Sequence, residues 1–283
     1  MDAIGFIGLG QIGAPMATHL LDWPGGLCVC DLRAEATAPF AEKGAQVGKT
    51  PAEVAPKADV ISVMVRDDDE VRNVVRGILS TARPGAVVAV HSTIRPGTAE
   101  ALAAEAEPRN VAVVDAPVSG GFIGATKGAL AVMAGGTDDA IGRCRAPFGR
   151  WATLIEHLGP VGAGTRAKLA RNLLQFVAFS AAAEAQRLAE AAGIDLTRLA
   201  NVVRHSDGVT RGPGAIMLRD TTAPLGPGEP LYEVLSHTRD LGEKDLRLAL
   251  ELGSELGVDL PFAELALERF AAGLGLASAK DGT

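Results

Sequence analysis

The chain has 283 residues, and its 27 lysines and arginines against 34 aspartates and glutamates give a formal net charge of −7 at pH 7. This length exceeds the usual size of one domain and predicts two. The acidic balance and the lack of a long basic run argue against a nucleic-acid surface. No apolar run approaches the ~20 residues of a membrane span, and no signal-type segment opens the sequence. We therefore expect a cytoplasmic protein that binds neither nucleic acid nor membrane.

The first part of the chain alternates short apolar runs with helix-length mixed segments. The runs are rich in valine and isoleucine and are continuous, which is typical of parallel strands buried on both faces. They read AIGFIGLG, LCVCD, DVISVMV, AVVAVHST, VAVVDAPVS, ALAVMAGG and ATLIEHLG. We therefore predict an α/β domain with a doubly wound, mostly parallel sheet over residues 1–162.

The pattern changes in the second part, residues 163–283. Residues 164–275 contain no convincing strand and predict a series of helices, the first of them a long helix over residues 162–193. Three prolines and two glycines within TTAPLGPGEP, residues 221–230, predict a loop between helices. The apolar stretch LLQFVAFSAAAEA gives the helical part more apolar surface than a small domain covers. We expect an all-α C-terminal domain that forms a homodimer or homotetramer.

The segment IGFIGLGQIGAPMATHL places glycines in G-x-G-x-x-G spacing after an apolar strand and before an amphipathic helix. An acidic residue, Asp31, ends the next apolar run. The glycines permit a tight turn and the close approach of backbone N–H groups to a pyrophosphate, so this context predicts a Rossmann-type dinucleotide site rather than an ordinary strand–helix turn. The turn residues expected at the cofactor are Gly8, Leu9, Gly10, Gln11, Ile12 and Gly13.

Asp31 has two interpretations, a generic turn residue or a ribose ligand. After such a fingerprint the second is favoured, because a carboxylate there accepts hydrogen bonds from ribose hydroxyls and repels a 2′-phosphate. Arg33, two residues later, softens that repulsion. We expect NAD to be favoured over NADP.

Three other groups suggest sites at first sight. The acidic run Asp67–Asp69 resembles a metal site, but it stands where a helix begins, and we favour capping. Cys28 and Cys30 form a C-x-C pattern that we interpret as two small residues in a buried strand, not a metal or redox site. His91 and His237 have no visible catalytic partner and are expected to be structural. No metal is expected.

Five separate segments of this chain, in their order along it, resemble motifs of the β-hydroxyacid dehydrogenases, the family that includes 3-hydroxyisobutyrate dehydrogenase and tartronate semialdehyde reductase. The resemblance covers nearly the whole chain and implies hydride transfer between NAD(P) and a small 3-hydroxyacid, similar to 3-hydroxyisobutyrate, or its semialdehyde. It also implies that the helical domain closes over the substrate. The segments are GFIGLGQIGAPMA, HSTIRPGTA, DAPVSGGFIGATKGAL, KLARNLL and EKDLRLAL.

The resemblance implies a role for each matching position. By this resemblance, Lys168 would be the general acid/base and Asn172 would help to orient the substrate. A desolvated lysine near a positive charge has a lowered pKa, which suits this chemistry. The substrate carboxylate would be held by Ser119, Gly120 and Gly121. The cofactor would be lined by Val65, Arg66, Thr93 and Lys244.

Simpler interpretations stay open for the single motifs. Lys168 and Asn172, four residues apart, also suit a solvated helix stripe, and Asn172 alone suits a helix cap or bridge. The Ser-Gly-Gly segment alone suits a turn, Thr93 a strand end, and Lys244 a solvated charge cluster with its neighbours.

The chain also departs from the family at some positions. The loop at 221–230 and the tail after Gly273 differ from what the resemblance implies. Phe122 and Ile123, after the glycine pair, favour a substrate with an alkyl substituent.

Two other functions are compatible with such a fold. An imine reductase-like enzyme resembles this family in both domains, but those enzymes generally replace the catalytic lysine. A non-catalytic nucleotide-binding scaffold would have no need for Lys168 together with Ser119, Gly120 and Gly121. The sequence therefore favours a dehydrogenase.

Overall fold

The structure, a computed structural model, describes residues 2–276. These residues form two compact units that divide between Asn172 and Leu173. The expected domain boundary at residues 162/163 coincides with the start of helix α8, Ala163–Ala191, which continues past that division. Residues 277–283, the end of the expected second domain, lie outside the described part.

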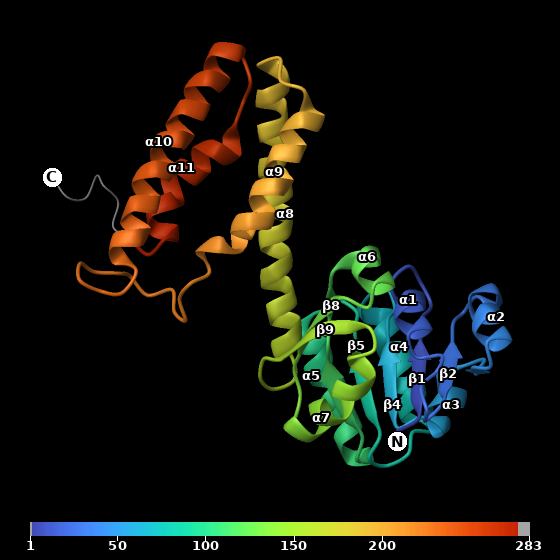
Figure 1. Ribbon diagram of the computed structural model, residues 1–283. Helices are drawn as coiled ribbons and strands as arrows, with labels where there is room; N and C mark the ends of the chain where they lie inside the picture. The colour runs from blue at the N-terminus through green and yellow to red at the C-terminus, as the bar shows by residue number, and fades with distance from the viewer. Residues whose placement is uncertain (1, 277–283) are drawn as a thin grey trace. The chain divides into compact units, whose positions relative to one another are not determined.

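The first unit is built on a six-stranded sheet in which all neighbouring strands are parallel (Figure 1). The strand order is β3-β2-β1-β4-β5-β6, the order of a dinucleotide-binding doubly wound sheet, whose direction of winding reverses between β1 and β4. The predicted fold class is confirmed. The strands are β1 Ile4–Ile7, β2 Leu27–Cys30, β3 Gln46–Val47, β4 Val60–Val63, β5 Val87–Val90 and β6 Ala112–Asp115.

Helices cover both faces of this sheet because strand side chains alternate between two apolar clusters. Ile4 and Phe6 of β1 belong to the cluster that packs against α1, α2 and α7, whereas Ile7 belongs to the cluster with α3, α4 and α5. The helices are α1 Gly13–Thr18, α2 Ala34–Glu42, α3 Pro51–Val54, α4 Asp68–Leu79, α5 Pro96–Ala106, α6 Gly121–Thr126 and α7 Asp138–Phe148. Short 3₁₀ turns follow at Ala55–Lys57 and Glu107–Arg109.

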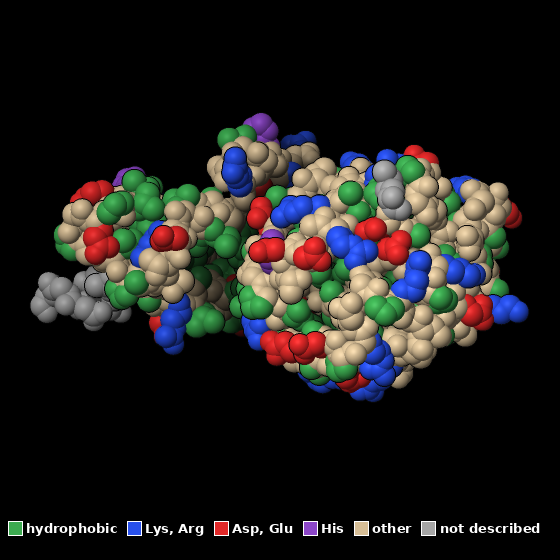
Figure 2. All heavy atoms as spheres, turned by 90° about the horizontal axis from the view of Figure 1, so that it is seen from below, with side chains coloured by type: hydrophobic (Ala, Val, Ile, Leu, Met, Phe, Trp, Pro, Cys, Tyr) green, Lys and Arg blue, Asp and Glu red, His purple; other side chains and the backbone are tan. Residues whose placement is uncertain are grey.

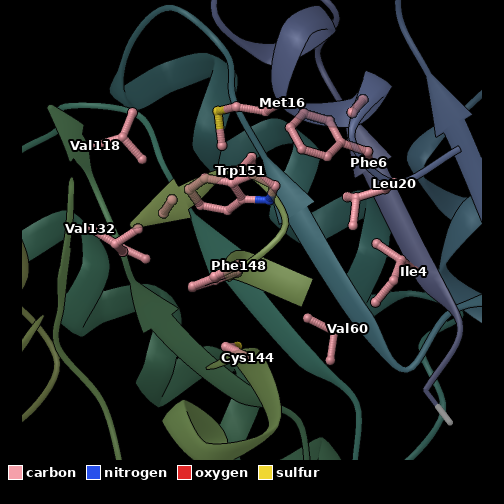
Figure 3. Close-up of a cluster of buried hydrophobic side chains, with 14 of the residues drawn as sticks. Ile4, Phe6, Met16, Leu20, Val60, Val118, Val132, Cys144, Phe148 and Trp151 are labelled. Carbon is pink, nitrogen blue, oxygen red and sulfur yellow. The ribbon is translucent and has the colours of Figure 1, made fainter. Parts of the chain in front are cut away.

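The first cluster contains the largest buried side chains (Figure 3). Phe148 of α7 packs against Trp151 with 4.9 Å between ring centroids. Cys144 is buried in the same cluster, while Cys28 and Cys30 of β2 both lie in the opposite one. The interpretation of the C-x-C pattern as a buried strand is confirmed.

A second, three-stranded sheet contains the last two predicted runs and the end of the run before them. It consists of β7 Val118–Ser119, β8 Leu130–Ala134 and β9 Ala152–His157, with β7 antiparallel and β9 parallel to β8. The run VAVVDAPVS is therefore divided between two sheets, and it breaks before Pro117, which has no N–H for a ladder. The short β3 was not predicted, because its two residues are exposed and have no apolar pattern.

The described part of the second unit, residues 173–276, contains helices and no strand, as predicted. It contains the rest of α8, then α9 Leu196–Thr210, α10 Tyr232–Leu256 and α11 Pro261–Gly273, with a 3₁₀ turn at Gly212–Ile216. Residues 221–230 form the predicted loop. Within residues 2–276, no helix combines the length and apolar character needed to cross a membrane.

The second unit buries few apolar side chains. Its described core cluster consists of Leu235, Leu274 and Leu276. A buried carboxylate, Glu184 of α8, accepts hydrogen bonds from the backbone N–H groups of Phe262 (2.9 Å) and Ala263 (3.1 Å) and so caps α11. Apolar side chains stand exposed among charged ones on this unit (left in Figure 2). They include Leu173, Phe176, Val177, Phe179, Val202, Val209, Val234, Leu248 and Leu265.

Candidate dinucleotide and substrate site

The glycine-rich turn joins β1 to α1, and its three glycines have different surroundings. Gly8 has φ = +95°, and a Cβ there would clash with the carbonyl oxygen of Met64. A Cβ on Gly13 would clash with the carbonyl oxygen of Gly8. Gly10 has no protein atom within 4 Å of a Cβ position, so a ligand can approach its backbone. Two glycines that pack the turn and one that leaves it open fit a dinucleotide pyrophosphate.

The other predicted turn residues differ in exposure. Gln11 is exposed, Ile12 is half-buried, and the Leu9 side chain is buried. Gly10 and Gln11 therefore form the accessible tip of the turn.

Asp31 follows β2 and is hydrogen-bonded to the glycine-rich turn. Its Oδ2 accepts from the Leu9 N–H (2.7 Å), and its Oδ1 accepts from the N–H (2.9 Å) and Nε (3.2 Å) of Arg33. Burial opposes ionisation, but the N–H groups of Arg33 and Leu9 and the Arg33 side chain hold the pKa of Asp31 below its ordinary value. The Arg33 guanidinium also donates to the Leu9 carbonyl oxygen (3.3 Å). An ionised carboxylate with a cation attached therefore stands beside the turn.

The segments after β4 and β5 are joined by Ser92. Its hydroxyl donates to the Val65 carbonyl oxygen (2.7 Å) and accepts from the Val65 N–H (2.9 Å). Arg66 is exposed, with its Nε 2.6 Å from a Glu70 carboxylate oxygen, and Thr93 is exposed beside Ser92. Val65, Arg66 and Thr93 thus lie at the same sheet edge as the glycine-rich turn, where ligands bind such folds. Sequence reasoning missed Ser92, although it precedes Thr93 in HSTIRPGTA.

Two residues of the acidic run, Asp67 and Asp68, accept hydrogen bonds from backbone N–H groups at helix starts, while Asp69 pairs with Arg72 (3.2 Å). Asp67 accepts from the Glu70 N–H (2.9 Å) at the start of α4, and Asp68 accepts from the Arg95 N–H (3.1 Å) and the Thr98 hydroxyl at the start of α5. The capping interpretation is confirmed. Among the residues that the structure describes, no group of three His, Cys, Asp or Glu is arranged to hold a metal ion.

His91 is a buried link between strand ends. Its Nδ1 lies 2.8 Å from the Ala116 carbonyl oxygen and its Nε2 lies 3.0 Å from the Ser62 hydroxyl. A carbonyl only accepts, so Nδ1 carries the proton and Nε2 accepts from Ser62. Burial lowers the pKa of His91 to about 4, against the opposing hydrogen bond to Ala116. This neutral imidazole has the structural role expected of it, and His237 is exposed on α10.

The predicted substrate segment lies between β7 and α6. Gly120 has φ = +132° and Gly121 has φ = +61°, both in the region that favours glycine. A Cβ on Gly120 would lie 2.9 Å from the Leu130 side chain, whereas Gly121 has open space. Ser119 is half-buried beside these two exposed glycines. A hydroxyl and uncovered backbone suit the binding of a carboxylate.

Lys168 of α8 reaches the strand that leads into this segment. Its Nζ donates to the carbonyl oxygen of Val118 at 2.6 Å, and Val118 directly precedes Ser119. The residue is 9% exposed, and its pKa is lowered, first by burial and then by the charge of Arg171. Asn172, one helical turn further, is half-buried and accepts from Arg171 (3.4 Å). Lys168 is thus a buried residue beside the predicted substrate segment and not part of a solvated stripe.

Asp115, at the end of β6, was not among the predicted site residues. It is fully buried, and its carboxylate accepts from the N–H groups of Gly162 (2.7 Å) and Thr165 (2.6 Å) at the start of α8. Burial raises the pKa of Asp115 against the effect of these hydrogen bonds. The residue opens DAPVSGG, but its partners lie about 50 positions along the chain, and the sequence carries no signal that pairs them.

Lys244 lies on α10 in the second unit, where it is exposed and pairs with Asp245 at 3.1 Å. The other predicted site residues all belong to the first unit. They bring into one unit a glycine-rich turn with an open Gly10, an ionised carboxylate at Asp31, a half-buried Ser119 beside two exposed glycines, and a buried lysine.

Comparisons with known proteins identify relatives of this chain. Residues 3–159 match the NAD binding domain of 6-phosphogluconate dehydrogenase. A Mycobacterium tuberculosis protein described as an uncharacterized oxidoreductase is 58% identical, covering 96% of this chain and 93% of its own. An NAD-dependent L-serine dehydrogenase of Pseudomonas aeruginosa is 35% identical, covering 95% of this chain and 91% of its own. Human mitochondrial 3-hydroxyisobutyrate dehydrogenase is 35% identical over 72% of this chain and 62% of its own.

Solved structures of similar proteins have the same fold as this chain. A putative oxidoreductase from Mycobacterium avium superimposes with a TM-score of 0.94 at 51% identity, covering 98% of this chain and all of its own. The 3-hydroxyisobutyrate dehydrogenase of Mycobacterium tuberculosis, determined with L-serine, has a TM-score of 0.68 at 32% identity, covering 96% of this chain and 94% of its own. An imine reductase from Streptomyces aurantiacus, at 19% identity and a TM-score of 0.76, covering 98% of this chain and 96% of its own, shares the fold.

Proposed function

The chain belongs to the β-hydroxyacid dehydrogenase family of oxidoreductases, and we propose that it is an NAD-dependent dehydrogenase of small 3-hydroxyacids with Lys168 as general acid/base. The observation that carries this proposal is the buried Nζ of Lys168, 2.6 Å from the carbonyl oxygen of Val118, next to Ser119. In this proposal Ser119 holds the carboxylate of the hydroxyacid, and the substrate hydroxyl lies near Lys168 Nζ.

Each group on this chain has a distinct task in the proposed reaction. The Ser119 hydroxyl and the backbone of Gly120 and Gly121 bind the substrate carboxylate. The bound nicotinamide cofactor supplies the chemistry of hydride acceptance. Lys168 takes the proton from the substrate hydroxyl at Nζ, and its lowered pKa increases the neutral fraction of the amine near pH 7. In the reverse direction the Lys168 ammonium returns that proton to the carbonyl oxygen, while Asn172 helps to orient the substrate.

The substrate class follows from the segment after the glycine pair. Phe122 and Ile123 are exposed at the start of α6 and offer apolar surface. We favour a 3-hydroxyacid with an alkyl substituent, such as 3-hydroxyisobutyrate, over the polar L-serine that one relative oxidises. A panel of 3-hydroxyacids and semialdehydes, assayed by cofactor absorbance with NAD and NADP, tests this choice. A kcat/KM for L-serine above that for 3-hydroxyisobutyrate would contradict it.

The cofactor and the assembly are further parts of the proposal. Asp31 favours NAD because its carboxylate is ionised beside the turn, although Arg33 stands close to it. Lys244 is proposed to line the cofactor.

The exposed apolar side chains of the helical unit, such as Phe176 and Phe179, support association with a second copy of the chain.

The Lys168→Ala variant tests the central claim. We expect kcat to fall by about 10² to 10⁴, the usual effect of losing a general acid/base, with little change in the Kd of NAD. Lys57→Ala is the control, because Lys57 is exposed before β4, at the opposite edge of the sheet. A Lys168→Ala variant that keeps more than about a tenth of kcat, where chemistry limits the rate, would show that the base lies elsewhere. If the native chain oxidises no hydroxyacid, a non-catalytic nucleotide-binding scaffold is favoured. If it reduces imines, an imine reductase-like enzyme is favoured.

A further inference from the structure

Two groups three residues apart hold the start of α8. Asp115 at the end of β6 binds the backbone N–H groups of Gly162 and Thr165, and Val118 of β7 accepts from Lys168 Nζ. Residues 115–118 therefore lie along the first turns of this helix, and the substrate segment Ser119–Gly121 follows directly. We call residues 115–118 and 162–168 the α8 clasp.

The packing around the clasp leaves the helix little freedom to move. A Cβ on Gly164 would lie 2.6 Å from the Asp115 carbonyl oxygen and would clash with that of Met133. A Cβ on Gly135 would clash with the Asp115 carboxylate. The backbones of Asp115 and Gly135 also exchange two hydrogen bonds, of 2.8 and 3.1 Å. The carboxylate is thus enclosed by glycine backbone on one side and by the helix N-terminus on the other.

We infer that Asp115 is a positioning residue for Lys168, which fixes the Nζ relative to Ser119–Gly121 by holding the first turn of α8 against β6. The inference rests on the proposed function of Lys168. Thr165, which Asp115 binds, lies three residues before Lys168, so the two share a helix face. Proton transfer requires hydrogen-bond reach, roughly 2.6–3.2 Å, and a shift of about 1 Å can cost 10²-fold in rate. A helix slip of that size would separate the base from its substrate.

The Asp115→Asn variant is the sharpest test, because it keeps the shape of the side chain and turns one acceptor oxygen into an NH₂ group that opposes a backbone N–H donor. We expect kcat to fall about 10- to 100-fold, the Kd of NAD to stay unchanged and the KM of the hydroxyacid to change less than kcat. Asp115→Ser, which is smaller and still carries an acceptor oxygen, serves if the first variant folds poorly.

The pH profile separates positioning from loss of stability. The charge that acts on Lys168 is that of Arg171 on the same helix, while the Asp115 carboxylate is bound to the N–H groups of Gly162 and Thr165 and Arg166 is paired with Glu100 of α5. If Lys168 leaves Val118 and becomes hydrated, its pKa rises and the acid limb of kcat/KM moves to higher pH. A partly unfolded sample would lower the amplitude and leave the limb in place.

Glu184 provides a matched control, since it is also a buried carboxylate that accepts from two N–H groups at a helix start. We expect Glu184→Gln to lower the unfolding midpoint yet to keep kcat within about twofold and the acid limb unmoved. An equal loss of kcat in both variants would overturn the inference, because a lost cap of any helix would then explain it.

Labelling provides a readout that does not depend on activity. Acylation of lysines in the intact protein, followed by mass spectrometry of the peptide that contains Lys168, should be faster in Asp115→Asn than in the native chain, with Lys57 as internal standard. Unchanged labelling together with native kcat would overturn the inference. If Lys168→Ala stays active the proposed function fails, while the labelling rate still shows whether Asp115 positions Lys168.

Discussion

The two units bury their apolar side chains to different extents. In the first unit, both faces of the six-stranded sheet are covered, and strand residues alternate between two closed clusters. In the second, three buried leucines form the described cluster while side chains such as Phe176 and Phe179 stand exposed. A unit with a closed core can fix groups to a fraction of an ångström, which the proposed chemistry needs. A unit with exposed apolar faces suits association.

The same chemical device has different consequences in the two units. Asp115 and Glu184 are both buried carboxylates that cap helices, α8 and α11 respectively. Only the cap by Asp115 adjoins a lysine that reaches the substrate segment. The role that we propose for Asp115 therefore rests on its place in the closed unit and not on capping itself.

The largest expected effect tests the closed core. Trp151→Ala removes a fully buried ring that packs against Phe148. We expect the free energy of unfolding of the first unit to fall by about 3–5 kcal/mol. Denaturant titration followed by circular dichroism measures this. Leu32→Ala, at a site that is 98% exposed, is the control and should stay within about 0.5 kcal/mol. Equal losses would show that the first unit is not held by this cluster.

The next effect concerns pH and the buried His91. Its pKa is lowered from 6.5 to about 4 in the folded chain, so the unfolded chain binds the extra proton between these values. Stability should therefore fall as pH drops through this window, by about 3 kcal/mol in total from this group. Urea unfolding at pH 7 and pH 4 measures the loss, and His91→Gln should reduce the difference between them. The same pH dependence in that variant would contradict the prediction.

A smaller effect concerns cofactor choice. A hydrogen bond to a charged group contributes roughly 1.5–3 kcal/mol, so we expect NAD to be favoured over NADP by at least about tenfold in kcat/KM. Asp31→Ala should narrow this gap mainly by raising the KM for NAD. Arg33→Ala is the companion variant and should weaken the use of NADP most. Equal or better use of NADP by the native chain would mean that Asp31 is not the ribose ligand.

We expect the smallest change in unfolding free energy from substitutions on the exposed surface of the second unit. The double change Phe176→Ser and Phe179→Ser should alter its unfolding free energy by only a few tenths of a kcal/mol. The same change should weaken self-association, seen by sedimentation as a shift of a native dimer or tetramer to lower mass. A native chain that sediments as a 29.0 kDa monomer at micromolar concentration would contradict the proposed assembly.

Most of the fold could be predicted because its signals are local. Continuous valine and isoleucine runs identified β1, β2, β4, β5 and β6, and the glycine spacing at Gly8, Gly10 and Gly13 identified the turn. The sequence did not separate β7–β9 into their own sheet, since burial alone does not reveal strand partners. Exposed β3 carried no apolar pattern.

Candidate site residues could be predicted where they carry a motif and not where they contact distant partners. Ser119, Gly120, Gly121 and Lys168 were proposed from the resemblance, and Lys168 Nζ donates to Val118, which precedes Ser119. Asp115 was missed because its partners are backbone N–H groups, which every residue except proline has. The pairing of Arg33 with Asp31 depends on the backbone conformation of the turn after β2, which no motif specifies.

The three cysteines have a practical consequence for labelling chemistry. All are free and buried, and burial raises the pKa of each thiol, to about 11 for Cys30 and about 12 for Cys144. Because the thiolate is the reactive form, maleimides and mild oxidants should leave the native chain untouched. A single cysteine introduced on the surface can therefore carry a fluorophore or spin label without removal of the natural ones.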